Sequence, residues 1–262
     1  MIEYIAGGLL SAITAVIAVK KKKLTFNAGL VATVAGALTY VWGGGETWAA
    51  LIAFFISAAI TARFKERVDP ESANQARKVS QVLANGFPAV LFAAIYYFTD
   101  DTLFRLSSVS VVACAAADTW SSDIGVLSKR KTVSILTFKQ IEAGQSGGIS
   151  PLGCVSCVLG ASFVAGIYVA AFFFKNGGKT PLAFSFAAVV LCGAIGSFAD
   201  SALGAGVQAK YRCRNKITEN RAEDAKLVSG FRIIDNDAVN LLSGFIAGGI
   251  SVAARAAEIL LK

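Results

Sequence analysis

The stretch AAADTWSSDIGVLSKRKTVSILTFKQIEAGQSGGIS, residues 115–150, decides how the rest of the chain is interpreted. An apolar segment runs into Asp118 and Asp123, and a basic cluster, residues 129–131, follows. A glycine-rich loop then leads into the next apolar segment. Clusters of lysine and arginine directly after an apolar segment are typical of membrane-spanning helices. The stretch therefore predicts that acids, cations and a flexible loop meet at a membrane surface.

Composition and hydropathy indicate an integral membrane protein. The 262 residues are 55% hydrophobic and 16% charged, with a mean hydropathy of +0.61, whereas soluble domains carry about 25% charged residues. The apolar residues form eight blocks, at about 2–19, 27–42, 46–62, 80–99, 103–122, 149–174, 182–206 and 237–254. Because a helix needs about 20 residues to cross a bilayer core, we predict an all-α, polytopic membrane protein with about eight transmembrane helices in a single transmembrane domain, residues 1–262. The fourth block is apolar only from Gly86 onward, so seven helices are the alternative.

The distribution of positive charge predicts the orientation in the membrane. The net charge is +8, and most lysines and arginines lie in four loops, at 20–23, 63–78, 129–139 and 210–232. These loops follow the first, third, fifth and seventh apolar blocks, so the positive-inside rule places them in the cytoplasm and both termini outside. Since the positive-inside bias accounts for the net charge, we predict no nucleic-acid partner. It predicts a multi-pass protein of the cell inner membrane, or of a plastid membrane if the source is photosynthetic.

Several kinds of catalytic site are excluded or disfavoured by residue type. The chain has no histidine, so histidine bases, phosphohistidine relays and histidine-based zinc sites are excluded. Cys154 and Cys157 have CxxC spacing, but no second ligand pair accompanies them. We interpret them as small apolar residues of a membrane helix rather than as a redox or metal site.

The polar residues of the apolar blocks gather at the predicted cytoplasmic side. Asp118 and Asp200 lie near the ends of their blocks, and the other polar groups open the blocks that follow: Asn85, the loop Gly144-Gln145-Ser146-Gly147-Gly148, Asn236 and Asn240. Ionisable groups within membrane segments are costly and mark functional sites. The simplest account is one site at the inner membrane face.

Asp118 and Asp200 lie in a short repeated sequence motif. Ala117-Asp118-Thr119 recurs as Ala199-Asp200-Ser201, each near the end of an apolar block and each before a basic loop. Repeated helix-end acids fit a pseudo-symmetric design, so an internal repeat is a further prediction.

The residue types at the predicted site favour phosphate chemistry. Asp118 and Asp200, with Asp123 as a more exposed third candidate, suit Mg²⁺, which prefers oxygen ligands and shares them with phosphate. The glycine loop and the helix start at Pro151 would offer backbone N–H groups to phosphate oxygens. Cations near the acids would spread the charge of a transferring phosphoryl group; the candidates are Arg63, Lys65, Lys129, Arg130 and Lys139.

Four motifs resemble a known family. ADTWSSDIGVLSKR, LTFKQIEAGQSGGISPLG, GSFADSALGAGVQ and IIDNDAVNLLSG, together with QVLANG at 81–86, are similar to a family of polytopic membrane proteins whose characterised members are phytyl-phosphate kinases of the vitamin E and phytol-salvage pathway. The resemblance implies phosphate transfer from a nucleoside triphosphate, CTP, to an isoprenoid monophosphate, giving its diphosphate. The positions that match are Asn85, Asp118, Ser122, Asp123, Gly144, Ser146, Gly147, Gly148, Asp200, Ser201, Gly204, Asn236 and Asn240.

The alternatives stay open at this point. A cytidylyltransferase would make a CDP-linked lipid from the same substrates, and a second kinase type would act on the free prenyl alcohol. A membrane transporter is the alternative from another class, although its site belongs near the bilayer midplane. The bilayer, an isoprenoid phosphate and a nucleoside triphosphate are the expected partners, and a homodimer is left open.

Overall fold

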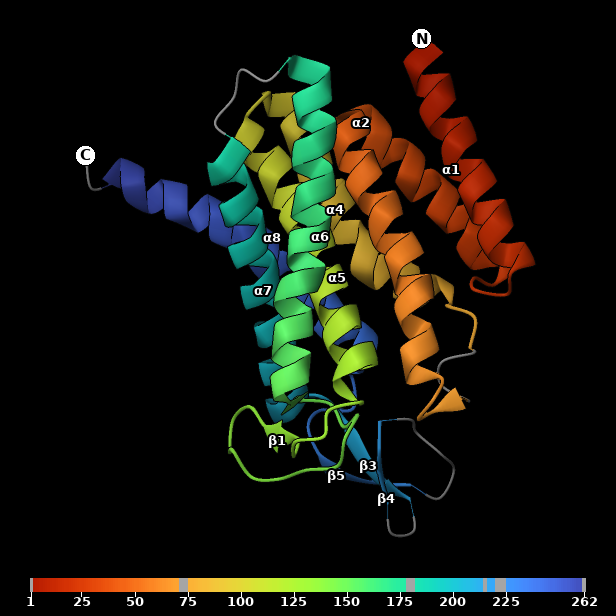
Figure 1. The fold of residues 1–262 in the computed structure, drawn as a ribbon, viewed down its shortest axis with the longest axis vertical. Coiled ribbons are helices and arrows are strands. Elements are labelled where there is room, and N and C mark those ends of the chain that lie inside the picture. Colours follow the sequence, from red (N-terminus) through yellow and green to blue (C-terminus); the bar gives the residue numbers. More distant parts are fainter. Residues whose placement is uncertain (1, 71–74, 178–181, 214–215, 220–224, 261–262) are drawn as a thin grey trace.

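The computed structural model describes residues 2–70, 75–177, 182–213, 216–219 and 225–260 as a mostly helical bundle (Figure 1). The helices of this part are α1 (Ile2–Lys20), α2 (Phe26–Lys65), α4 (Val79–Thr99), α5 (Thr102–Gly125), α6 (Pro151–Asn176), α7 (Leu182–Gly206) and α8 (Asn236–Leu260). Each predicted apolar block coincides with one helix or with part of one. The second and third blocks, 27–42 and 46–62, are the two arms of α2.

The connection predicted between those two blocks is a sharp break rather than a loop. Only Gly44 leaves helical geometry inside α2, with φ +84°, a conformation that glycine adopts without steric cost. The second arm then returns beside the first, so that the Trp48 indole N–H donates to Ser11 Oγ of α1 at 2.9 Å. The Tyr40 and Trp48 rings meet edge-on at 5.9 Å across the bend.

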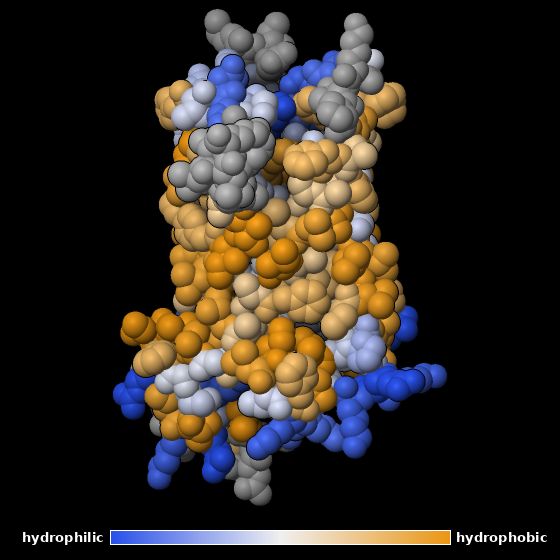
Figure 2. All heavy atoms as spheres, turned by 90° about the vertical axis from the view of Figure 1, so that its left-hand side faces the viewer, coloured by the Kyte–Doolittle hydropathy of each residue, from blue (hydrophilic) through white to orange (hydrophobic). Residues whose placement is uncertain are grey.

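The outer surface is that of a multi-pass integral membrane protein. Four of the described helices, α2, α4, α6 and α7, are long and apolar enough to cross a membrane. Large hydrophobic side chains point outward on them, as at Leu159 (54% exposed) and Leu191 (61% exposed). Figure 2 shows a hydrophobic band across the middle of one face, with hydrophilic residues at both ends. Eight membrane spans, an internal repeat and the orientation of the termini remain predictions.

Helix α5 is the centre of the bundle and packs against α2, α4, α6, α7 and α8. Residues 107–117 are buried without interruption. Glycines of the neighbouring helices permit this packing: a Cβ at Gly160 would lie 2.8 Å from the Ala116 carbonyl oxygen, and one at Gly193 would lie 2.7 Å from Ala113 Cβ. Because α5 faces protein instead of lipid, it can carry serines and aspartates that a lipid-facing helix would not tolerate.

Two small sheets at one end of the bundle correct the all-α prediction (Figure 1). Strands β1 (Val133–Ser134) and β2 (Gly148–Ile149) pair antiparallel, and β3 (Lys210–Cys213) pairs antiparallel with both β4 (Lys216–Thr218) and β5 (Lys226–Ser229). The strands are two to four residues long, too short for an alternating pattern to predict. β1 and β3–β5 lie in the basic loops and β2 ends the glycine loop, all at the end of the bundle where α5 and α7 finish (Figure 1).

A buried ion pair holds three helices together at the opposite end. Glu46, in the second arm of α2, is 2% exposed, and its carboxylate accepts from Arg105 of α5 and Lys175 of α6, both at 3.0 Å. The Arg105 guanidinium also lies over the Tyr96 and Phe172 rings, at 5.0 Å and 4.9 Å from their centroids. The ion pairs therefore join α2, α5 and α6, and the contact between Arg105 and Tyr96 adds α4.

We expect Glu46→Gln to lower the free energy of unfolding by about 3–5 kcal/mol, because it leaves the buried Arg105 charge without its partner. The measurement is thermal unfolding of the purified protein in detergent. Glu142→Gln, in an exposed loop, is the matched control and should unfold like the wild type. Equal midpoints for the two variants would show that the pair does not hold the helices.

Candidate functional site

Two neighbouring cavities open at the end of the bundle that carries the strands. The loop cavity, about 230 Å³, is bounded by the Gly144–Gly148 loop and by the ends of α5 and α7. The cationic cavity, about 250 Å³, is bounded by α2, α4, α5 and α8. Lys65, Asp118, Ser122 and Asn236 line both cavities and form the wall between them.

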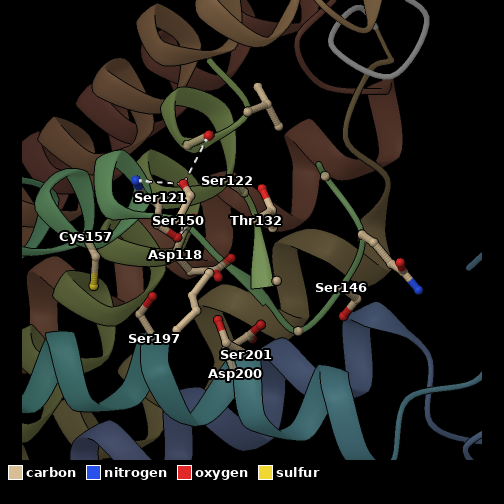
Figure 3. A pocket seen from close by; sticks show the side chains of 18 of the residues that line it. Asp118, Ser121, Ser122, Thr132, Ser146, Ser150, Cys157, Ser197, Asp200 and Ser201 are labelled. Atoms are coloured by element: carbon tan, nitrogen blue, oxygen red, sulfur yellow. Dashed lines mark hydrogen bonds between the residues drawn. The ribbon is translucent and has the colours of Figure 1, made fainter. Parts of the chain in front are cut away.

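Asp118 and Asp200 come together in the loop cavity. Their carboxyl groups, one from α5 and one from α7, point into the same space (Figure 3). Asp200 is 9% exposed and accepts a hydrogen bond from Ser243 Oγ of α8 at 3.0 Å. Asp118 interacts electrostatically with Asp200 and Asp123, and Lys65 and Arg77 supply opposite charge beside it.

Asp123 does not join that pair. It is 7% exposed, so the expectation that it is the more exposed acid was wrong. Five residues beyond Asp118, it points to another side of the helix, lines only the cationic cavity and accepts a 2.8 Å hydrogen bond from Thr61 Oγ1. Among the described residues, no group of three or more acids and cysteines could hold a metal ion.

The glycine loop is docked against the end of α7. Gly147 has φ +81°, and a Cβ there would lie 2.5 Å from backbone atoms of Ala205. Ser146 anchors the loop: its hydroxyl donates to Gln208 Oε1 at 2.6 Å, and its carbonyl accepts from Lys210 Nζ at 2.9 Å. The loop therefore needs glycine for close packing as well as for access to a ligand.

Three backbone N–H groups of this loop already have partners, and the first of them, Gln145 N–H, donates to the Glu142 carbonyl at 3.3 Å. Ser146 N–H donates to the Glu219 carboxylate at 2.8 Å, and Gly148 N–H donates to the Gln145 carbonyl at 3.0 Å. The Glu219 carboxylate thus binds a backbone N–H group that the sequence predicted to bind phosphate. Ser150 caps α6 by accepting from Gly153 N–H at 3.1 Å, and Pro151 follows in the first turn as predicted.

The sequence did not point to Lys210 and Glu219 as site residues. Lys210 is 8% exposed, and burial lowers the pKa of its ammonium group while the nearby Glu219 carboxylate opposes the shift. Both residues lie in a loop whose positive charge was interpreted as a topology signal. Only the β3–β4 hairpin shows that this loop folds back onto Ser146.

Of the cations predicted to lie near the acids, Lys65 lines the cavities and the others do not. Lys129 and Arg130 are exposed and line neither cavity. Lys65 lines both, and Lys23 and Arg77 line the cationic cavity. The 129–131 cluster follows α5 directly in sequence, but its loop turns outward, whereas the loops before α2 and α4 bring their cations to the acids.

Arg77 is held in place by its own backbone. Its N–H donates to the Lys23 carbonyl at 3.0 Å, and its carbonyl accepts from Thr25 N–H at 3.1 Å. Its guanidinium lies 5.8 Å from the Phe54 ring centroid. Burial lowers the pKa of this guanidinium, while the carboxylates of Asp123 and Asp118 oppose the shift. Lys23, interpreted from the sequence as a topology signal, is fixed beside it.

The remaining predicted residues divide between the cavities. Gly144, Ser146, Gly147, Gly148 and Ser201 line the loop cavity, Asn85 and Asn240 line the cationic cavity, and Ser122 and Asn236 line both. Asn85 and Asn240 each donate from Nδ2 to a carbonyl one turn earlier, at 3.1 Å and 2.9 Å. The structure thus gathers most of the predicted residues around two adjoining cavities; those that line neither cavity are Arg63, Lys129, Arg130, Lys139 and Gly204.

The fold and this polar end define a class: a multi-pass integral membrane protein with a composite polar site at one end of its helices. The chain matches the family described as Integral membrane protein DUF92 over residues 9–248, and it belongs to that family. The family of polytopic membrane proteins predicted from the motifs is thereby confirmed.

Two relatives span nearly the whole chain. Protein PGR of Arabidopsis thaliana is 29% identical over 260 residues, covering 90% of each chain. Uncharacterized membrane protein MJ0933 of Methanocaldococcus jannaschii is 27% identical over 237 residues, covering 89% of this chain and 87% of the relative. No solved structure matches the chain.

We expect Gly147→Ala to release the glycine loop, because the added Cβ would collide with α7. Gly144→Ala is the matched control: Gly144 has nearly the same φ, +83°, but a Cβ there meets only Val126 Cγ1, at 3.6 Å. Both variants carry the left-handed backbone cost of about 1–2 kcal/mol. Hydrogen exchange of residues 139–149 should rise markedly only in Gly147→Ala. Equal exchange in both variants would contradict the docking.

Proposed function

We propose that this protein is a CTP- and Mg²⁺-dependent kinase that converts a prenyl monophosphate to its diphosphate. The observation that carries the proposal is the pair of cavities that share one wall at Asp118. Two cavities in contact suit two phosphorylated substrates, because a phosphoryl group must pass directly from one to the other. The motif resemblance to phytyl-phosphate kinases supports the same reaction.

The loop cavity has the donor atoms that a magnesium nucleotide requires. Asp118 and Asp200 offer carboxylate oxygens, and Ser122, Ser201 and Asn236 add neutral oxygens. Mg²⁺ is usually held by one or two carboxylates together with substrate phosphates and water. Two facing acids therefore fit a metal that arrives with a nucleoside triphosphate, and bound Mg²⁺ would neutralise charge on its phosphates. Asp123 lines only the cationic cavity, and we propose that it acts from that side of Asp118.

The reaction needs positioning and charge neutralisation more than proton transfer. An oxygen of the acceptor monophosphate forms a bond to the γ-phosphorus of CTP while the bond from that phosphorus to the β–γ bridging oxygen breaks. The products are the prenyl diphosphate and CDP. A fully ionised acceptor loses no proton, so a chain without histidine can support the step. Lys65, which lines both cavities, is placed to offset the charge that the two substrates bring together.

The location of the cavities also favours an enzyme acting on a lipid headgroup over a transporter. Substrate sites of secondary transporters lie near the bilayer midplane. Here the acids lie at the end of the bundle that carries the polar strands and the basic loops (Figure 1). A phosphate headgroup resides at that depth, where water-soluble CTP can also reach it.

We expect Asp118→Asn and Asp200→Asn each to lower kcat/KM by about 100-fold or more, because each removes charge that holds the metal nucleotide. The assay mixes purified full-length protein with CTP, Mg²⁺ and a prenyl monophosphate and identifies products by mass. Asp100→Asn, an exposed left-handed helix cap at the opposite end, should keep wild-type activity.

The product masses decide among the enzymes. Prenyl diphosphate with CDP supports the proposal, whereas a CDP-linked lipid with diphosphate identifies a cytidylyltransferase. Turnover with the free prenyl alcohol alone identifies an alcohol kinase. No nucleotide turnover with any prenyl substrate would overturn the enzyme proposal.

We expect Lys65→Met to lower kcat/KM by about 100-fold, because Lys65 is the cation common to both cavities. Lys129→Met serves as the control, since Lys129 is exposed outside them. Initial rates at saturating Mg²⁺ measure both variants. A large loss in Lys129→Met with little change in Lys65→Met would assign the catalytic charge to Lys129 instead of Lys65.

A further inference from the structure

An apolar groove runs between α1, α2 and α4. Its walls are Ala15 of α1, Val82 and Val90 of α4, and Leu51, Ile52 and Phe55 of α2. Helix α1 packs chiefly against α2, so α1 and α4 form the two sides of the groove without closing it. Gly86 of α4 lies on its wall, and no atom lies within 4 Å of the position that a Cβ would take there.

This groove is continuous with the cationic cavity. Phe55, Arg77, Gln81 and Asn85 line both spaces. At this junction the lining changes from aliphatic side chains to the guanidinium of Arg77 and then to Lys23 and Lys65. An apolar channel that ends in three cations matches an amphiphile with an alkyl chain and a phosphate head.

The loop cavity is more acidic than the cationic cavity, in which the three cations are balanced by Asp118, Asp123 and Asp237. It contains the facing acids Asp118 and Asp200, a third acid, Glu219, and one cation, Lys65. An isolated lipid phosphate would be repelled there, whereas a nucleotide carrying Mg²⁺ would be attracted. The two cavities therefore differ in which phosphorylated partner they favour.

We propose that the groove holds the hydrocarbon chain of the lipid monophosphate, with its head in the cationic cavity and the nucleotide in the loop cavity. This assignment rests on the proposed function. It makes α1, Gly86 and the Arg77 junction the determinants of acceptor chain length, and it places the acceptor phosphate on the Arg77 side of Asp118.

The first test fills the groove. Gly86→Leu should lower kcat/KM for a long acceptor, phytyl phosphate, by about 10-fold or more while leaving that for short dimethylallyl phosphate nearly unchanged, since only the long chain requires the apolar contact. Gly166→Leu is the matched control, because Gly166 of α6 also has open space at its Cβ position and does not line the groove. Equal losses for both acceptors, or equal effects of the two variants, would overturn the assignment.

A second test does not depend on turnover. A long-chain alkyl phosphate with a diazirine on its chain is photolysed with the protein in nanodiscs, and labelled peptides are mapped. Labelling of α1 and of residues 82–90, reduced in Gly86→Leu but not in Gly166→Leu, supports the assignment. Labelling spread over the lipid-facing surface and insensitive to Gly86→Leu overturns it. Groove labelling without CTP turnover would remove the kinase proposal and leave the chain site standing.

Discussion

Three carboxylates stand at the end of a buried helix and its neighbour, and the bundle must compensate for their charge in a largely apolar protein. Asp123 accepts from Thr61, Asp200 accepts from Ser243, and Lys65 and Arg77 lie beside Asp118. Burying a charge is costly unless it is paired or hydrogen-bonded. These partners come from α2, from α8 and from the segment before α4, so the acids organise how those elements converge.

That compensation is uneven, and the unevenness gives the site its two sides. Around Asp123 the charges balance, because Lys23, Lys65 and Arg77 line the same cavity as Asp118, Asp123 and Asp237. Around Asp200 the acids outnumber the cations. Asp118, between them, belongs to both surroundings. Under the proposed function, this asymmetry would let the lipid phosphate bind through cations and the nucleotide through its metal.

The opposite end of the bundle solves the same electrostatic problem differently. Glu46 is paired with Arg105 and Lys175, which satisfies its charge within the protein, and two aromatic rings lie against the Arg105 guanidinium. The acids at the strand end border cavities, whereas Glu46 lines none of the cavities described above. Burial of an acid in this bundle is therefore not by itself a sign of function; a carboxylate that borders a cavity is the more informative observation.

The sequence alone determined the membrane class, the positions of the helices, the family and most of the residues around the site, because hydropathy blocks and motifs are local properties of the chain. The tertiary structure decided which cations meet the acids, that Asp123 turns away from Asp200, and that the loop N–H of Ser146 is bound by Glu219. The partners involved are 62 residues apart for Thr61 and Asp123 and 73 apart for Ser146 and Glu219. Which side chains meet across such separations depends on how the helices pack around α5, and a local sequence pattern does not determine that packing.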